Sequence, residues 1–141
     1  MAEPPTDRDP TTDAPPFRAL GRPVVGPSRD LETFPRPDHL TRVRFTSDEL
    51  TSHCPVTHQP DFYAVEVLYH PTTLCLESKS LKRYLWSFRE TSMFAETLAS
   101  TIARDITSAT HATYCRVTLQ QHIRGGLRLE AVAEIGAPNT T

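Results

Sequence analysis

Cys54 and Asp61 are the pair whose residue types and spacing most directly indicate chemistry. Cys54 stands in the polar, proline-bounded stretch SHCPVTHQPDF, ahead of the first clear strand pattern. A free cysteine is usually a small buried apolar residue, although reactive groups concentrate in loops on rigid scaffolds. The residue type alone leaves both interpretations of Cys54 open. Cys75 and Cys115 lie within apolar strand patterns, which favours buried structural roles.

Asp61 follows Pro60 at the start of a strand pattern. An aspartate in that setting most often serves a turn. Seven residues from Cys54 and across a turn, it could also return to the thiol. A thiolate whose target develops negative charge needs a nearby proton donor. The two residues together therefore suit attack on a polarised carbon, such as that of a nitrile, a thioester or an imine.

Histidines beside Cys54 raise the alternative of a zinc site. His53 precedes the cysteine, and His58 follows it with the spacing Cys-x3-His, which can supply two ligands. A third ligand would have to come from elsewhere, such as Cys115 or His122. Ligand sets assembled this loosely are common by chance, so no metal is expected.

Cationic groups gather in two other stretches. Lys79 and Lys82 lie three apart near the start of a helical pattern, where two lysines normally form a solvated face. Arg124, Gly125 and Gly126 form a turn with bare backbone N–H groups, which permits close approach of a phosphate. Together these residues could hold a phosphate-rich ligand. No Rossmann or Walker motif is present, so a nucleotide would be held by another route.

Two glutamates are candidates for binding a heterocycle. Glu77 precedes the helical pattern, and Glu96 lies in the first turn of a second one. A carboxylate can accept two N–H bonds from a guanine-like edge. Glu96 could equally complement the helix macrodipole, which needs no ligand.

Four segments show the alternation of apolar and polar residues that is typical of strands. They are 62–70, 74–77, 113–122 and 127–135. The turn residues Pro71-Thr72-Thr73 separate the first two, and Arg124-Gly125-Gly126 separates the last two. The sequence therefore predicts two hairpins.

Between these hairpins the apolar residues recur at helical spacing. From about Ser78 they are Leu81, Leu85 and Phe88, and after Ser92, which can cap a second helix, they are Phe94, Leu98, Ile102 and Ile106. The order strand, strand, helix, helix, strand, strand predicts an α+β domain with helices on one face of an antiparallel sheet. It resembles the tunnelling fold, in which subunits join their sheets into a barrel and form active sites at their interfaces.

Length and composition limit the class of protein. The 141 residues suffice for one domain, and the net charge of -2 indicates no basic surface for nucleic acid. No apolar run approaches the roughly 18 residues of a membrane span. Residues 1–30 hold more than half of the 13 prolines and predict a disordered tail before a single domain over 31–141. Three cysteines are a sparse, odd set, so we expect a cytoplasmic protein.

Three motifs resemble the NADPH-dependent 7-cyano-7-deazaguanine reductases, the nitrile reductases of queuosine biosynthesis. ESKSLKRYLWSFR (77–89) is similar to the signature of that family, a glutamate followed by two lysines and aromatic residues. FTSDELTSHCPVTHQPDF (45–62) resembles its nucleophile segment, and IRGGL (123–127) resembles its Arg-Gly-Gly turn. The motifs follow the family order over about 45 to 130.

The resemblance implies a mechanism without metal. Cys54 adds to the nitrile carbon as a thioimide, Asp61 protonates the nitrogen, and two molecules of NADPH reduce the group to a primary amine. The implied substrate-binding residues are Leu76, Glu77, Ser78, Ala95 and Glu96. The implied NADPH-binding residues are Ser78, Lys79, Arg124 and Gly125, to which the helix-face argument adds Lys82. The tunnelling fold further implies a homo-oligomer with interface active sites and a small-molecule substrate.

The sequence departs from the family pattern at three positions. Ala95 stands where histidine is usual, His58 where glycine is usual, and Arg83 where leucine or tyrosine is usual. The first departure puts substrate range or rate in question, and the second the course of the Cys54 loop. Two alternatives follow: a zinc cyclohydrolase-like enzyme of the same fold, and a repurposed deazapurine-binding or secondary-metabolism protein.

Overall fold

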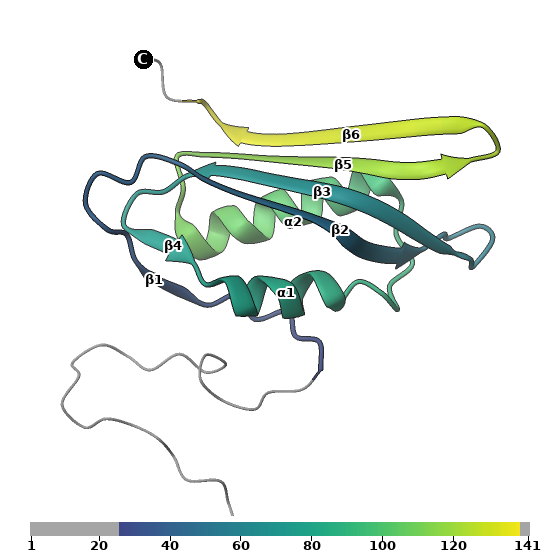
Figure 1. Ribbon diagram of the computed structural model, residues 1–141, viewed down its shortest axis with the longest axis horizontal. Coiled ribbons are helices and arrows are strands. Elements are labelled where there is room, and N and C mark those ends of the chain that lie inside the picture. The colour runs from purple at the N-terminus through teal and green to yellow at the C-terminus, as the bar shows by residue number, and fades with distance from the viewer. Residues whose placement is uncertain (1–25, 139–141) are drawn as a thin grey trace, which may run out of the picture.

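The computed structural model describes residues 26–138 (Figure 1). Its elements are β1 (Thr33–Pro35), β2 (Val43–His53), β3 (Pro60–His70), β4 (Leu74–Leu76), α1 (Ser78–Trp86), α2 (Ala95–Thr110), β5 (Tyr114–Arg124) and β6 (Leu127–Gly136). The predicted α+β class is confirmed. Within 26–138, no helix is long and apolar enough to cross a membrane. The predicted tail lies outside the described residues, except for 26–30.

A four-stranded antiparallel sheet of order β2-β3-β5-β6 carries both helices on one face (Figure 1). The β5–β6 hairpin is confirmed. The predicted hairpin of 62–70 with 74–77 is wrong, because β4 pairs with β1 in a separate small sheet, with Thr33 opposite Leu76. β3 instead pairs with β2 on one side and with β5 on the other, and sequence patterns did not reveal β2.

A β-bulge explains why β2 escaped prediction. Between Ser47 and Leu50 the register with β3 shifts, so that two residues of β2 oppose one of β3. Val43 and Phe45 pack against the core before the bulge, whereas Leu50 is buried after it. The apolar residues therefore change from odd to even positions within one strand, and the alternation that signals a strand is lost.

The second helix begins later than predicted. Its N-cap is Phe94, which makes no side-chain capping bond, and Ser92 does not cap it. Ser92 instead forms an isolated parallel bridge with His53. His53 donates its N–H to the Thr91 carbonyl at 2.9 Å and accepts from the Met93 N–H at 3.1 Å. Because the segment before α2 is extended against the end of β2, the helix cannot include it.

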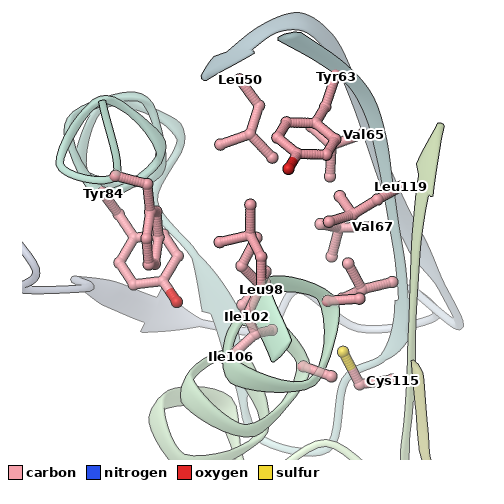
Figure 2. Packing of buried hydrophobic residues seen from close by; sticks show 14 of the residues in the cluster. Leu50, Tyr63, Val65, Val67, Tyr84, Leu98, Ile102, Ile106, Cys115 and Leu119 are labelled. Atoms are coloured by element: carbon pink, nitrogen blue, oxygen red, sulfur yellow. The ribbon is translucent and has the colours of Figure 1, made fainter. Parts of the chain in front are cut away.

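The core lies between the sheet and the helices (Figure 2). Most residues of the predicted inward faces are buried, among them Val65, Val67, Tyr69, Leu98, Ile102, Ile106, Cys115, Val117 and Leu119. Phe94 was wrongly placed on the stripe of the second helix, because it is the N-cap of α2 and is 54% exposed. Tyr84 of α1 packs edge-to-face on Phe88 with ring centroids 5.1 Å apart, and donates to Asp105 of α2 at 2.7 Å. Full burial of a large apolar side chain contributes about 1.5–3 kcal/mol, so this layer holds α1 and α2 against the strands.

The lead-in to β1 is bound to the far end of α1. The Arg29 guanidinium stacks 3.8 Å from the Phe88 ring centroid and donates to Thr91 Oγ1 at 3.1 Å. Arg83 donates to the Gly26 carbonyl at 2.9 Å. These contacts brace the segment that in turn holds the end of β2.

Candidate active site

Cys54 lies in the loop between β2 and β3, and the backbone closes that loop tightly. The Cys54 N–H donates to the Gln59 carbonyl, and the His58 N–H donates to the Cys54 carbonyl, both at 2.9 Å. His58 adopts a left-handed conformation with φ 60°. The Cys54 side chain remains partly exposed at the tip of the sheet. The loop thus presents a thiol on a fixed backbone.

The surroundings of the three cysteines differ in a way that separates their roles. Hydrogen bonds from the Thr57 hydroxyl, then from the backbone N–H groups of Thr57 and Val56, lower the pKa of Cys54 to about 7. Burial raises the pKa of Cys115 to about 11. The predicted burial of Cys75 and Cys115 is confirmed. Near neutral pH, Cys54 therefore carries substantial thiolate, the nucleophilic form of the residue.

Asp61 and Arg124 form an ion pair beside this loop. Asp61, at the start of β3, is 3% exposed, and Arg124 Nη1 donates to its Oδ1. A second bulge, between Gln121 and Arg124, turns Arg124 toward the helix-covered face of the sheet. Arg124 was predicted to bind NADPH, but here it contacts Asp61, and its charge also helps to lower the pKa of Cys54.

A buried polar pair that the sequence did not indicate lies at the same end. The Ser52 hydroxyl donates to the Tyr63 hydroxyl at 3.3 Å, and both residues are fully buried. Burial raises the pKa of Tyr63, and the charges of Glu96 and Cys54 raise it further. Glu96 and Cys54 thus both act on Tyr63, and the role of Glu96 in substrate binding stays a prediction. Tyr63 escaped notice because it continues an apolar strand pattern.

Leu76, Glu77 and Ser78 lie at the opposite end of the sheet. Glu77 is the N-cap of α1: its Oε1 accepts from the Lys79 N–H at 2.6 Å and its Oε2 from the Ser80 N–H at 2.7 Å. An ionised carboxylate has about four acceptor positions, so each oxygen can accept one further bond. All three residues line a pocket of about 490 Å³ that also includes Tyr69.

The two lysines of α1, Lys79 and Lys82, lie in different surroundings. Lys82 lines a cleft of about 510 Å³ between α1 and β2, together with Ser78, Trp86 and Arg89. Lys79 is not one of its lining residues. Two cations beside a half-exposed indole suit a ligand that combines phosphates with an aromatic base. Arg89 and Trp86 were not predicted as site residues, because they continue the helical pattern without a separate signal.

The single chain does not bring the two groups of predicted residues together. Leu76 donates its N–H to the Tyr69 hydroxyl at 2.9 Å, which places it at the far end of β3 from Asp61. From Asp61 to Tyr69 the strand covers roughly 26 Å at about 3.3 Å per residue. In Figure 1, the β2–β3 loop and the β5–β6 turn lie at one end, and β4 with the start of α1 at the other. The expected single site is therefore divided within the chain.

Comparisons with known proteins identify the family of this chain. The family model described as "QueF-like protein" matches residues 60–140. A protein from Alkalilimnicola ehrlichii named NADPH-dependent 7-cyano-7-deazaguanine reductase is 42% identical over 116 residues, which cover 79% of this chain and 88% of that protein. This chain belongs to the QueF-like family. A protein of the same name from Syntrophus aciditrophicus is 42% identical over 121 residues, covering 84% of this chain and 86% of its own length.

The fold agrees with a solved structure of a QueF-like protein. The crystal structure of the archaeosine synthase QueF-Like in the apo form superposes with a TM-score of 0.66 at 27% identity. The match covers 71% of this chain and 98% of that one. This agreement supports the predicted tunnelling fold.

The structure shows the backbone conformation or the burial of two residues that depart from the QueF-like pattern, His58 and Ala95. His58 holds the positive φ that glycine adopts without strain, so the loop keeps the conformation that glycine would permit. Ala95 is only 4% exposed at the start of α2, where it belongs to the core. A histidine at that position would have to displace its neighbours in the core.

The zinc alternative finds no support in the geometry of this QueF-like protein. Within residues 26–138, no three His, Cys, Asp or Glu side chains are grouped to hold a metal ion. His53 Nε2 lies 4.0 Å from Glu90, and His58 is exposed. Burial also keeps Cys115, which was considered as a third ligand, in its protonated form.

Proposed function

We propose that this chain reduces the nitrile of 7-cyano-7-deazaguanine to the primary amine, with NADPH as reductant. The chain is an oxidoreductase of the QueF-like family, and its curated relatives carry that activity in their names. One observation on the site supports the proposed chemistry. Cys54, whose pKa is lowered to about 7, stands partly exposed beside a buried carboxyl, Asp61. Such a pair suits addition to a nitrile better than metal-assisted hydrolysis.

The residues of the β2–β3 loop perform the covalent step. The Cys54 thiolate forms a C–S bond to the nitrile carbon, and the electron pair of the C–N π bond moves to nitrogen. Asp61 supplies the proton that this nitrogen takes up. Arg124 donates to Asp61 Oδ1, and its guanidinium can stabilise the carboxylate that is left once the proton has been transferred. Release of the thiolate after the first reduction restores Cys54.

Two molecules of NADPH, bound in turn, would each supply one of the two hydrides that the conversion of a nitrile to an amine requires. The cleft between α1 and β2 fits such a molecule in its chemistry. Lys82 and Arg89 offer positive charge to phosphates, and Trp86, 43% exposed, offers a face for an aromatic base. Ser78, Lys79 and the Arg124-Gly125 turn remain predicted contacts. The glycine turn is open: nothing lies within 4 Å of a Cβ built at Gly125.

We also propose that the complete site forms between subunits of a homo-oligomer. The division of the predicted residues between the two ends of the sheet supports this, since Cys54 and Glu77 cannot reach one substrate in one chain. Leu76, Glu77 and Ser78 of one subunit would face Cys54, Asp61 and Glu96 of the next. Heterologous contacts of this kind form a ring when the rotation between successive subunits closes. We place the enzyme in the cytoplasm and its product in the queuosine pathway.

The activity is tested directly with purified protein, 7-cyano-7-deazaguanine and NADPH. We expect loss of NADPH absorbance, two NADPH consumed for each nitrile, and the mass of 7-aminomethyl-7-deazaguanine. Cys54→Ala should give neither turnover nor a covalent adduct by intact mass, whereas Cys115→Ala should retain the adduct. An adduct on the wild type without NADPH oxidation would instead favour the repurposed deazapurine-binding alternative.

A further inference from the structure

Ser80 of α1 is a buried polar residue whose hydroxyl joins two segments of the chain. It is 1% exposed, and Glu77 at the start of the helix is 5% exposed. Ser80 Oγ accepts a hydrogen bond from the Glu32 N–H at 2.9 Å and donates to the Glu77 carbonyl at 2.8 Å. A hydroxyl has one proton, and the Glu32 carbonyl lies farther away, at 3.5 Å, so the Glu77 carbonyl receives this proton. The hydroxyl therefore fastens the segment before β1 to the first turn of α1.

The bonds around Glu77 fix its backbone as well as its carboxylate. Its N–H donates to the Glu32 carbonyl at 2.8 Å, and its carbonyl accepts from the Leu81 N–H at 3.2 Å in addition to the Ser80 hydroxyl. Both carboxylate oxygens accept from backbone N–H groups of α1, Oε2 from that of Ser80 at 2.7 Å. In an ordinary capping box, the third residue of the helix returns a side-chain bond to the N–H of the N-cap. Here Glu32 accepts from that N–H, and Ser80 in turn holds Glu32.

We propose that Ser80 is a positioning residue that fixes the orientation of the Glu77 carboxylate for substrate binding. Ser80 and Glu32 are not lining residues of the pocket of about 490 Å³ that Glu77 lines, so they act on a bound heterocycle through Glu77. A planar carboxylate accepts two parallel N–H bonds in one plane, and a shift of its backbone weakens both. The inference rests on the proposed function, because Glu77 is taken as the residue that binds the heterocycle. It goes beyond that function by assigning the alignment to a buried serine and to the segment before β1.

Loss of the Ser80 hydroxyl should weaken binding of the nitrile and leave the cofactor cleft unchanged. In Ser80→Ala, the two backbone N–H groups that hold the carboxylate remain, so α1 keeps its cap. The Glu32 N–H loses its acceptor, and the Glu77 carbonyl loses one of its two donors. One net hydrogen bond corresponds to a factor of roughly 2 to 13 in an equilibrium constant, so we expect the affinity for 7-cyano-7-deazaguanine to fall about three- to tenfold.

The test is a calorimetric titration of 7-cyano-7-deazaguanine into Cys54→Ala, which forms no adduct, with and without Ser80→Ala. The affinity of the same proteins for NADPH is followed by the fluorescence of Trp86, the one tryptophan of the chain, and should be unchanged by Ser80→Ala. With Cys54 intact, Ser80→Ala should raise the KM for the nitrile and leave the KM for NADPH as it is. Ser80→Cys, which keeps the shape with a weak donor and acceptor, should have an intermediate affinity for the nitrile.

Thr110→Val is the matched control, because Thr110 makes the same kinds of bond without contacting Glu77. It is fully buried, and its hydroxyl donates to the Ile106 carbonyl at 2.8 Å and accepts from the Ala112 N–H at 3.3 Å. Thr110→Val should therefore lower the thermal midpoint of unfolding, as Ser80→Ala does, and leave the affinity for the nitrile unchanged.

An unchanged affinity for the nitrile in Ser80→Ala, or an equal loss in Thr110→Val, would overturn the proposal. So would equal losses of affinity for the nitrile and for NADPH, or failure of both Ser80 variants to fold, since Ser80 would then be a structural residue. If Ser80→Ala weakens binding of the nitrile but the wild type does not oxidise NADPH with it, the positioning role stands and the proposed function fails. Wild-type turnover with no effect of Ser80→Ala on either affinity gives the reverse result.

Discussion

Two inactive variants should regain activity when their subunits are mixed. Cys54→Ala removes the nucleophile, and Glu77→Gln removes the charge of the predicted substrate-binding carboxylate while keeping one Oε acceptor for the start of α1. The two residues lie at opposite ends of a sheet whose central strand covers roughly 26 Å between Asp61 and Tyr69. Each mixed interface can therefore combine an intact Cys54 from one subunit with an intact Glu77 from its neighbour.

The size of the recovery follows from random assembly. In an equal mixture, a given interface takes its Cys54 side from a Glu77→Gln subunit with a chance of about one half. It takes its Glu77 side from a Cys54→Ala subunit with the same chance. About a quarter of the interfaces are then complete, so the mixture should reach about 25% of wild-type turnover. If both residues served one site within one chain, no complete site could form.

The assay dissociates each purified variant in mild denaturant, mixes them, removes the denaturant and follows NADPH oxidation with the nitrile. Each variant treated alone is the control for residual activity, and treated wild type gives the reference for refolding. Size-exclusion chromatography of Glu77→Gln checks that loss of the charged cap leaves assembly intact. Turnover no higher than that of the separate variants, with wild-type recovery complete, would refute the division of the site between subunits.

Three further predictions concern single residues. Asp61→Asn should still bind the nitrile but reduce it about 10²- to 10⁴-fold more slowly, and a rate within a few-fold of wild type would remove Asp61 from the mechanism. His58→Gly relieves a positive φ and should raise the free energy of unfolding by up to about 1 kcal/mol in denaturant titrations; a stability loss would show that the imidazole makes a needed contact. Burial, with the bond to Asp105, raises the pKa of Tyr84, so its folded state favours the neutral hydroxyl. The stabilisation that follows from this raised pKa is fully present below about pH 10 and is lost as pH rises further, by up to about 1.4 kcal/mol per pH unit. Tyr84→Phe should make the free energy of unfolding less dependent on pH in that range.

The regular parts of the fold could be predicted because their patterns are local. The apolar stripe of α2 and the alternation in β3, β5 and β6 follow directly from burial on one face. β2 could not be predicted, because its bulge reverses the alternation halfway along the strand. The pairing of β4 with β1 depends on a contact between segments about 40 residues apart, for which a three-residue strand carries no signal.

The site was predicted in its residue types better than in its geometry. Cys54 is partly exposed in its polar loop, whereas Cys75 and Cys115 are buried in the strands whose apolar patterns indicated burial. The contact of Arg124 with Asp61 was not foreseen, because a bulge decides which face of β5 carries the guanidinium. The sequence motif that contains Glu77 also does not show that this residue is the N-cap of α1. Both outcomes depend on backbone geometry that residue identity does not encode.

The positions of the two bulges determine where β2 and β5 can change in length during evolution. Asp48 and Glu49 of β2 oppose a single residue of β3, and His122 and Ile123 of β5 oppose a single residue of β6. A one-residue deletion at either place restores a regular ladder and leaves the following side chains on their present face. The same deletion at Thr51 would carry the thiol to the other face of the sheet. Length changes between descendants of this sequence should therefore be confined, within these strands, to the two bulges.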